Sequence, residues 1–224
     1  MPNPTRSRWT VSALLAVLTA VAVGACSTAA TTGPGTAPAS SAGGSASGSG
    51  DTAAAEQYCT TKGGMLVDRV ATWNTNADPS AWLQLAGRWR VCEFETGSGD
   101  QATRISVDLT TLSSPEPTIA AIAYLSKVRT TSPPQPSANP ADWSCRNDYL
   151  GASSFGNTAS VGGWVDQSQP VFKVMDYCVF ADGSAIDEFG LWYHANGAIR
   201  GADLAPLFAY QPGGKLPAMF QSGR

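Results

Sequence analysis

Two pairs of cysteines with the same internal spacing constrain the fold of this chain more than any other feature. The interval from Cys59 to Cys92 equals the interval from Cys145 to Cys178. Equal intervals indicate a repeated unit when the residues around the two pairs also match. The alternative is two unrelated disulfide loops that share similar turn residues.

The residues around the cysteines favour a repeated unit. A helix N-cap residue precedes the first cysteine of each pair, Asp51 in one half and Asn139 in the other, and glycine follows each predicted helix. The second cysteine of each pair lies in a run rich in aromatic and β-branched residues, which is typical of a strand, and a glycine-containing turn comes next. The same reasoning predicts further strands over residues 104–109 and 189–194, and helices over residues 119–129 and 201–210.

These patterns predict an α+β fold with two tandem units, at residues 51–130 and 131–224. Each unit is expected to be a helix packed on a small antiparallel sheet of about three strands and stapled by one disulfide. Units of this size have small cores, so we expect each disulfide to matter for stability. The expected pairing joins Cys59 to Cys92 and Cys145 to Cys178, one of the three ways in which four cysteines can pair.

The N-terminus predicts export and a lipid anchor. Two arginines precede a short apolar run that ends in small residues directly before Cys26, a pattern typical of a secretory signal. The cysteine after the small residues resembles the lipobox of bacterial lipoproteins, which implies cleavage after residue 25 and thioether lipidation of Cys26 with fatty acids such as palmitate. The apolar run is about 15 residues, shorter than the roughly 20 that span a bilayer. We therefore expect residues 1–25 to be a signal peptide of a lipoprotein anchored in the cell membrane on its extracytoplasmic face, with ordinary secretion as the alternative.

Residues 26–50 are expected to be a flexible linker that begins with the lipidated cysteine. Beyond Cys26 they contain only Ser, Thr, Ala, Gly and Pro, a composition that cannot bury enough apolar surface to offset the entropy of ordering. Cleavage would remove Arg6 and Arg8 from the 14 basic residues and leave all 17 acidic ones. The resulting acidic balance argues against a nucleic-acid partner, which needs a basic surface. The four cysteines that remain in such an exported chain are expected to form disulfides.

The second half of the chain also resembles a known family. Asn139-Pro140-Ala141 precedes the helix cysteine, and the run from Tyr177 to Phe189 contains a cysteine, an Asp-Gly turn and an acidic pair before an aromatic residue. These motifs resemble a small bacterial domain family of unknown function, found in short exported lipoproteins that are often labelled haemolysins. The first half resembles the family in part, through its helix cysteine and the glycine pair Gly63-Gly64. The resemblance implies an exported domain, here in two copies, and it implies no established reaction.

The residues that could carry chemistry form no recognisable catalytic or metal-binding motif. A hydrolytic triad would need His194, the single histidine, with Asp187 or Glu188 to orient it and a serine such as Ser184 as nucleophile. The nucleophile-elbow motif of such enzymes is absent from the sequence. The cysteines are too far apart for a zinc motif, and the acids around Asp182 lack the spacing of a calcium loop. We expect no cofactor and no metal, and we rank an enzyme last among the functions.

Tryptophans are the least ordinary residues outside the cysteine pairs. Trp73, Trp82 and Trp164 lie between paired cysteines, in segments where loops are expected. Exposed aromatic residues on loops favour contacts with ligands or proteins, whereas the alternative is that they fill a core. We therefore expect a non-catalytic binding module that contacts an envelope protein or a small ligand. The alternative function is a protease inhibitor or a regulator of an envelope enzyme, because disulfide-rigid domains lose little entropy on binding.

Overall fold

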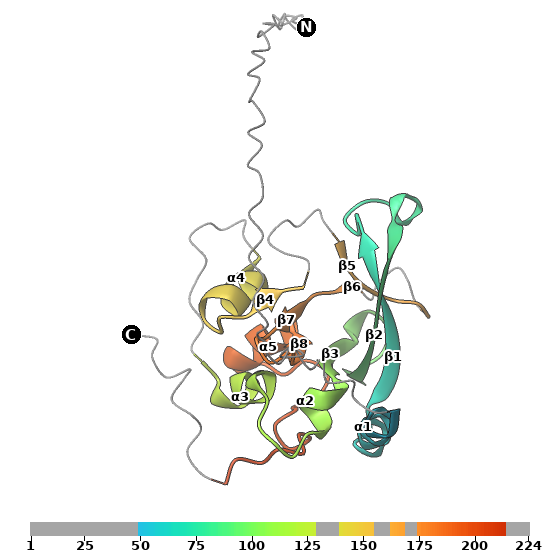
Figure 1. Ribbon diagram of the computed structural model, residues 1–224. Helices are drawn as coiled ribbons and strands as arrows, with labels where there is room; N and C mark the ends of the chain where they lie inside the picture. The colour runs from blue at the N-terminus through green and yellow to red at the C-terminus, as the bar shows by residue number, and fades with distance from the viewer. Residues whose placement is uncertain (1–48, 129–138, 155–161, 169–173, 214–224) are drawn as a thin grey trace, which may run out of the picture. The chain divides into compact units, whose positions relative to one another are not determined.

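The computed structural model describes residues 49–128, 139–154, 162–168 and 174–213 (Figure 1). The first half of the chain contributes α1 (Ser49–Thr61), β1 (Met65–Trp73), β2 (Leu83–Thr96), β3 (Thr103–Asp108), α2 (Leu109–Ser113) and α3 (Ile119–Ser126). The second half contributes α4 (Pro140–Asn147), β4 (Ala152–Ser153), β5 (Gly162–Asp166), β6 (Val174–Met175), β7 (Tyr177–Val179), β8 (Ala185–Asp187) and α5 (Glu188–Ala195). The fold is therefore α+β, as the sequence predicts.

The strands form one curled antiparallel sheet. Their order across the sheet is β4-β7-β8-β3-β2-β1-β5-β6. β6 lies at one edge of the sheet and β7 lies next to the other edge, yet only Asp176 separates them in the sequence. The sheet therefore has to curl so that its two edges come close together. Strands from both halves share this sheet, and the expected layout of two units with their own small sheets is not confirmed.

The two halves of the chain meet in the middle of the sheet, where β3 pairs with β8 through Val107 and Ile186. β2 and β1 lie on one side of this pair, and β7 and β4 lie on the other. β5 departs from this arrangement, because it pairs with β1 along residues 69–73. The second half of the chain therefore also supports the outer side of the long hairpin that β1 and β2 form.

Both expected disulfides are present, and the predicted pairing is confirmed. Cys59 of α1 is bonded to Cys92 of β2, and Cys145 of α4 is bonded to Cys178 of β7, each across 33 residues of sequence. All four cysteines are buried. Each half of the chain thus has one helix fastened to one strand of the common sheet.

A glycine packs against each disulfide in the same way. A Cβ atom on Gly64 would lie 2.3 Å from the Sγ atom of Cys92, and one on Gly151 would lie 2.5 Å from the Sγ atom of Cys178. The amide of each glycine donates a hydrogen bond to the carbonyl oxygen of the helix cysteine, at 3.0 Å in the first half and 2.9 Å in the second. The glycines that the sequence places after each helix are therefore required by this close approach.

The expected strand over residues 189–194 is wrong, because these residues belong to the helix α5. Asp187 ends β8 and caps the helix, with its side chain accepting a hydrogen bond from the amide of Phe189. Gly190 lets the helix approach β3, since a Cβ atom there would lie 2.5 Å from the side chain of Ile105. Residues 201–210 form turns instead of the expected helix. The strand expected over 104–109 is confirmed as β3, which ends at Asp108, and the helix expected over 119–129 is confirmed as α3, which ends at Ser126.

The sheet has an apolar core on each face, because side chains along a strand alternate between the two faces. One core lies between the sheet and the helices, and its buried residues include Phe94, Ile105, Val107, Leu112, Tyr124, Ile186, Leu191 and Phe208. The other core lies within the curl of the sheet and contains buried Val67, Val91, Met175, Tyr177 and Ala185. Trp89 and Trp164 pack against this second core.

Candidate functional site

The far end of the β1–β2 hairpin forms an arm, which we define as residues 70–88. β1 and β2 pair from Met65 and Glu93 at the base to Trp73 and Leu83 at the far end. β3 pairs with β2 along residues 91–96, so the arm lies beyond β3, and Figure 1 shows its turn projecting past β5. The arm is therefore a long two-stranded element whose base is built into the sheet.

Large apolar side chains are exposed on this arm. Trp73 is 46% exposed, Leu83 is 60% exposed and Leu85 is 38% exposed. Trp73 and Leu83 are direct cross-strand partners, so their side chains lie on the same face of the hairpin. We call Trp73, Leu83 and Leu85 the arm patch. Grouped exposed apolar residues of this size mark contact surfaces more often than isolated ones do.

The structure brings the three tryptophans singled out in the sequence to this end of the sheet, but only Trp73 is exposed. Trp164 of β5 pairs with Ala71 of β1 and is half-buried. Trp82 is also half-buried, and its indole Nε1 donates a hydrogen bond to the carbonyl oxygen of Ala77 at 2.9 Å, which closes the turn of the arm. Of the three residues, Trp73 alone is exposed for contact, whereas Trp82 and Trp164 pack largely within the protein.

An aromatic chain connects the arm to the interior of the curl. The rings of Trp164 and Trp89 meet edge to face with their centroids 5.3 Å apart, and Trp89 and Tyr177 are 4.8 Å apart. Tyr177 is completely buried, whereas the two tryptophans are half-buried. Contacts of this geometry stabilise aromatic pairs beyond the burial of their surface, so they hold β2 at the base of the arm against β5 and β7.

A buried ion pair lies beneath these aromatic residues and is the main feature that sequence reasoning missed. Arg69 of β1 and Glu93 of β2 are both fully buried and form a salt bridge. The guanidinium of Arg69 also donates to the carbonyl oxygen of Trp164 at 3.2 Å, and the hydroxyl of Ser106 donates to Glu93 at 2.9 Å. These contacts join β1, β2, β3 and β5. The signal for these contacts was a charged residue two positions after an inward-facing valine in each strand, Arg69 after Val67 and Glu93 after Val91.

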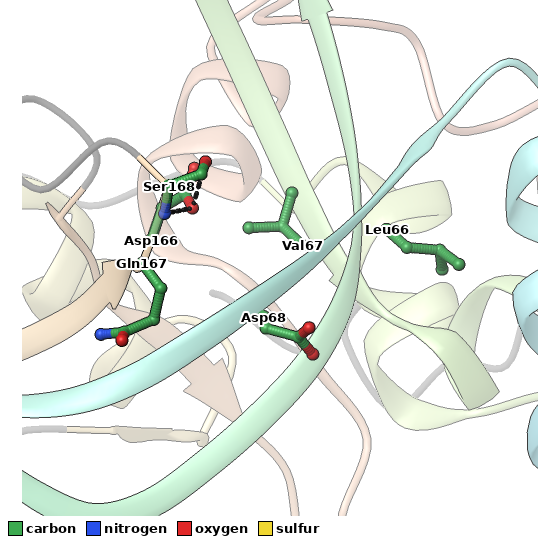
Figure 2. Close-up of a pocket in the computed structure, with 6 residues that line it drawn as sticks. All are labelled: Leu66, Val67, Asp68, Asp166, Gln167 and Ser168. Carbon is green, nitrogen blue, oxygen red and sulfur yellow. Dashed lines mark hydrogen bonds between the residues drawn. The ribbon is translucent and has the colours of Figure 1, made fainter.

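A small open pocket of about 220 Å³ lies between β1 and the end of β5. The pocket is lined by Leu66, Val67 and Asp68 of β1 and by the segment from Asp166 to Ser168, and Figure 2 shows Val67 pointing toward that segment. The guanidinium of Arg90 binds Asp68 at 2.7 and 2.8 Å and holds the pKa of that carboxyl below its usual range. Asp166 accepts hydrogen bonds from the amide and the hydroxyl of Ser168, both at 2.8 Å. Both carboxylates are therefore engaged with neighbouring groups.

The residues of a hydrolytic triad are not brought together. His194 lies buried on α5, and its ring stacks on Tyr124 with the centroids 3.7 Å apart. Within the described residues, neither ring nitrogen of His194 makes a hydrogen bond. Burial, and to a smaller extent the charge of Lys127, lowers the pKa of His194 to about 4. The hydroxyl of Ser184 instead donates to Asp182 and accepts from the amide of Ala120, at 2.5 and 3.0 Å.

The described residues were expected to hold no metal and no membrane-spanning helix. In the part of the chain that the structure describes, no group of three or more His, Cys, Asp or Glu side chains is placed to hold a metal ion. Asp182 accepts a hydrogen bond from the amide of Ile119 at 2.8 Å, which links its turn to the start of α3. No helix within the described residues is both long and apolar enough to cross a membrane. Cys26 and the predicted signal and linker segments lie outside the described residues, apart from the last two residues of the linker.

Comparison with protein-family models, with curated proteins and with solved structures finds no match. The resemblance of the second half to small exported-lipoprotein domains therefore stays a prediction. What the chain does is inferred from its own surface, on which the arm patch is the strongest candidate for contact with another molecule.

Proposed function

We propose that the protein is a surface lipoprotein, anchored on the extracytoplasmic face of the cell membrane, whose folded part is a non-catalytic binding module. The single observation that carries the binding role is the arm patch, with Trp73 and Leu83 side by side and about half exposed. The anchor is supported by the lipobox pattern that ends at Cys26. The two disulfides fit an oxidising compartment outside the cytoplasm.

Rigidity of the arm supports this role. The Cys59–Cys92 disulfide fastens β2 to α1 at the base of the hairpin, and the Arg69–Glu93 ion pair joins β1 and β2 there. A surface that is already ordered loses little conformational entropy on binding. Exposed tryptophan is the residue type that most often contributes strongly to an interface. An envelope protein or a small ligand with an apolar surface fits these properties.

We also infer that the two halves of the chain are copies of one unit. The identical arrangement of glycine and disulfide supports this, as does the strand order, in which β3-β2-β1 and β8-β7-β4 extend in opposite directions from one central pair. The copies differ in their hairpins, because the first carries the arm and the second contributes β5 and β6 to its side. In this account the second copy supports the binding surface of the first.

A protease inhibitor or regulator of an envelope enzyme is the second candidate, favoured by the turn of the arm. Asp78 accepts hydrogen bonds from the amide and hydroxyl of Ser80 at 2.9 and 2.6 Å, and Trp82 closes the turn on Ala77. The turn is thus both exposed and braced, as inhibitory loops need to be. This role requires saturable inhibition of a protease at a one-to-one ratio, and a broad panel of proteases without any inhibition would exclude it.

Replacing Trp73 with alanine is expected to weaken partner binding at least tenfold, because truncation of a central interface tryptophan commonly costs 2 kcal/mol or more, or about thirtyfold. The measurement is retention of the partner from solubilised source-cell envelope by the immobilised protein, followed by titration of the eluted partner. Ile199→Ala is the matched control, since Ile199 is 48% exposed outside the arm. Equal binding by the two variants would contradict the role of the arm patch.

Replacing Cys26 with alanine is expected to move the protein from the membrane fraction to the soluble fraction. The thioether to the lipid forms on this sulfur, and stable anchoring takes two or more acyl chains. Fractionation and the intact mass of the mature protein measure the change. Ser27→Ala is the control and is expected to keep the lipid mass. A Cys26→Ala protein that stays in the membrane fraction would show that another feature anchors it.

A further inference from the structure

Three carboxyl groups lie together where α4, α5 and the junction of β6 and β7 meet. Asp142 lies in α4, Asp176 is the junction residue, and Glu188 is the first residue of α5. The amide of Glu188 donates a hydrogen bond to the carbonyl oxygen of Asp176 at 3.0 Å, which places these two residues side by side. We call Asp142, Asp176 and Glu188 the carboxyl cluster. Neither the sequence motifs nor the proposed binding role accounts for it.

Glu188 is the most unusual member of the carboxyl cluster. It is 1% exposed, and within the described residues neither of its carboxyl oxygens makes a hydrogen bond. The hydroxyl of Ser153 in β4 favours the charged form, more strongly than any one neighbouring carboxylate disfavours it but less strongly than burial does. The Oδ1 atom of Asp176 is likewise buried without a hydrogen bond in the described residues. A buried carboxylate without donors is costly, so one of these groups is expected to hold a proton.

The charges around Glu188 do not offset its own. The charged groups that act on it are Asp176, Asp142 and Asp187, which are all acidic. Arg146 of α4 is committed to Asp142, with contacts of 3.1 and 2.6 Å. The cations Arg200 and Arg69 act on Asp187. Burial and these like charges raise the pKa of Glu188 to about 8, and burial with the charge of Asp142 raises that of Asp176 to about 6.

We propose that the carboxyl cluster is a proton-controlled latch, which holds α4 against α5 and the sheet while it is protonated and releases α4 when it ionises. A protonated carboxyl can donate a hydrogen bond to its carboxylate neighbour, whereas two ionised carboxylates repel each other. The Cys145–Cys178 disulfide fastens α4 to β7, so the release is a local opening and not the loss of the whole fold.

The direction of the pH effect follows from the raised pKa of the latch. Burial raises the pKa of Glu188 from 4.5 to about 8, so the closed state is fully favoured below pH 4.5 and loses that advantage as the pH rises through 8. Asp187 contributes in the same direction, since burial raises its pKa to about 7. Between pH 4.5 and 8, the proton that Glu188 loses on opening makes the opening equilibrium rise about tenfold per pH unit, and the rise levels off above pH 8.

Hydrogen exchange of the α4 backbone amides in the full chain tests this latch. Exchange is measured from pH 5 to pH 9 and corrected for the intrinsic rate of the amide at each pH. We expect opening of α4 to increase about tenfold per pH unit from pH 5 to about 7.5 in the natural sequence and to level off above pH 8. Glu188→Gln is expected to remove most of this increase, whereas Glu116→Gln, which removes an exposed acid from the loop before α3, is expected to leave it unchanged.

Two results would overturn the latch. One is α4 protection that does not change with pH in the natural sequence, and the other is the same increase in Glu188→Gln as in the control. If Glu188→Gln does not fold, the pKa of the Glu188 carboxyl is measured by carbon-13 titration of the natural sequence. A pKa near 4.5 would reject the latch, and a pKa well above 4.5 would support it. None of these measurements depends on partner binding by the arm patch.

Discussion

Replacing Arg69 with methionine is expected to lower the free energy of unfolding by about 3–5 kcal/mol, because breaking a buried ion pair from one side leaves a buried charge uncompensated. Glu93 is fully buried and would keep the hydroxyl of Ser106 but lose the guanidinium that neutralises it. The lost contact to the Trp164 carbonyl would also loosen β5 from β1. Urea denaturation followed by circular dichroism measures the change.

Two further variants make this prediction specific. Arg88 is exposed on β2, and its guanidinium donates to the carbonyl oxygens of Leu85 and Gly87, so Arg88→Met is expected to change stability by less than about 0.5 kcal/mol. The double variant with Arg69→Met and Glu93→Leu is expected to recover much of the loss, because apolar replacement of both partners removes the uncompensated charge. An Arg69→Met protein as stable as Arg88→Met would contradict this role of the ion pair.

Removing either disulfide is expected to cost about 2–5 kcal/mol, the usual loss for a native bridge in a small exported domain. Each bridge spans 33 residues and joins a helix to a strand in a buried position. The paired replacement of Cys59 and Cys92 by alanine therefore lowers the melting temperature by about 2–4 °C for each kcal/mol lost. The paired replacement of Cys145 and Cys178 is expected to behave similarly.

Cys26→Ala is the control for the disulfide variants, since it removes the cysteine that lies outside both bridges. Its unfolding free energy is expected to match that of the natural sequence. Calorimetry on all three variants at one pH measures the comparison. A loss smaller than about 1 kcal/mol in both paired variants would mean that the helices are held by packing alone.

Local signals in the sequence predicted α1, α3, α4 and both disulfides, but they missed α2 and α5, and Asp51 lies within α1 instead of capping it. Asn139 caps α4 as expected, through hydrogen bonds to the amides of Ala141 and Asp142. The equal cysteine spacing predicted both bridges, because the same helix, glycine and strand recur around them. The sheet could not be predicted in the same way. β4, β6, β7 and β8 are only two or three residues long, too short to show alternation, and their pairing depends on distant parts of the chain.

The candidate sites, too, could be predicted only where a local sequence signal marks them. Trp73 could be identified from its residue type and segment, but the pairing of Trp73 with Leu83 and the burial of Trp82 depend on the register and turn of the hairpin. The aromatic residues of α5 favour a strand by propensity, whereas these residues form a helix that Asp187 caps. The carboxyl cluster joins Asp142 to Glu188 from distant segments, so no sequence motif indicated it.

Site-specific photocrosslinking in the source cells tests the binding role most directly. A photoreactive residue placed at Leu83, which is 60% exposed on the arm patch, is expected to give one dominant, saturable adduct whose mass identifies the partner. The same residue at Ile199 is expected to give no such adduct. Absence of an adduct from Leu83, or identical adducts from both positions, would contradict a binding module that acts through the arm.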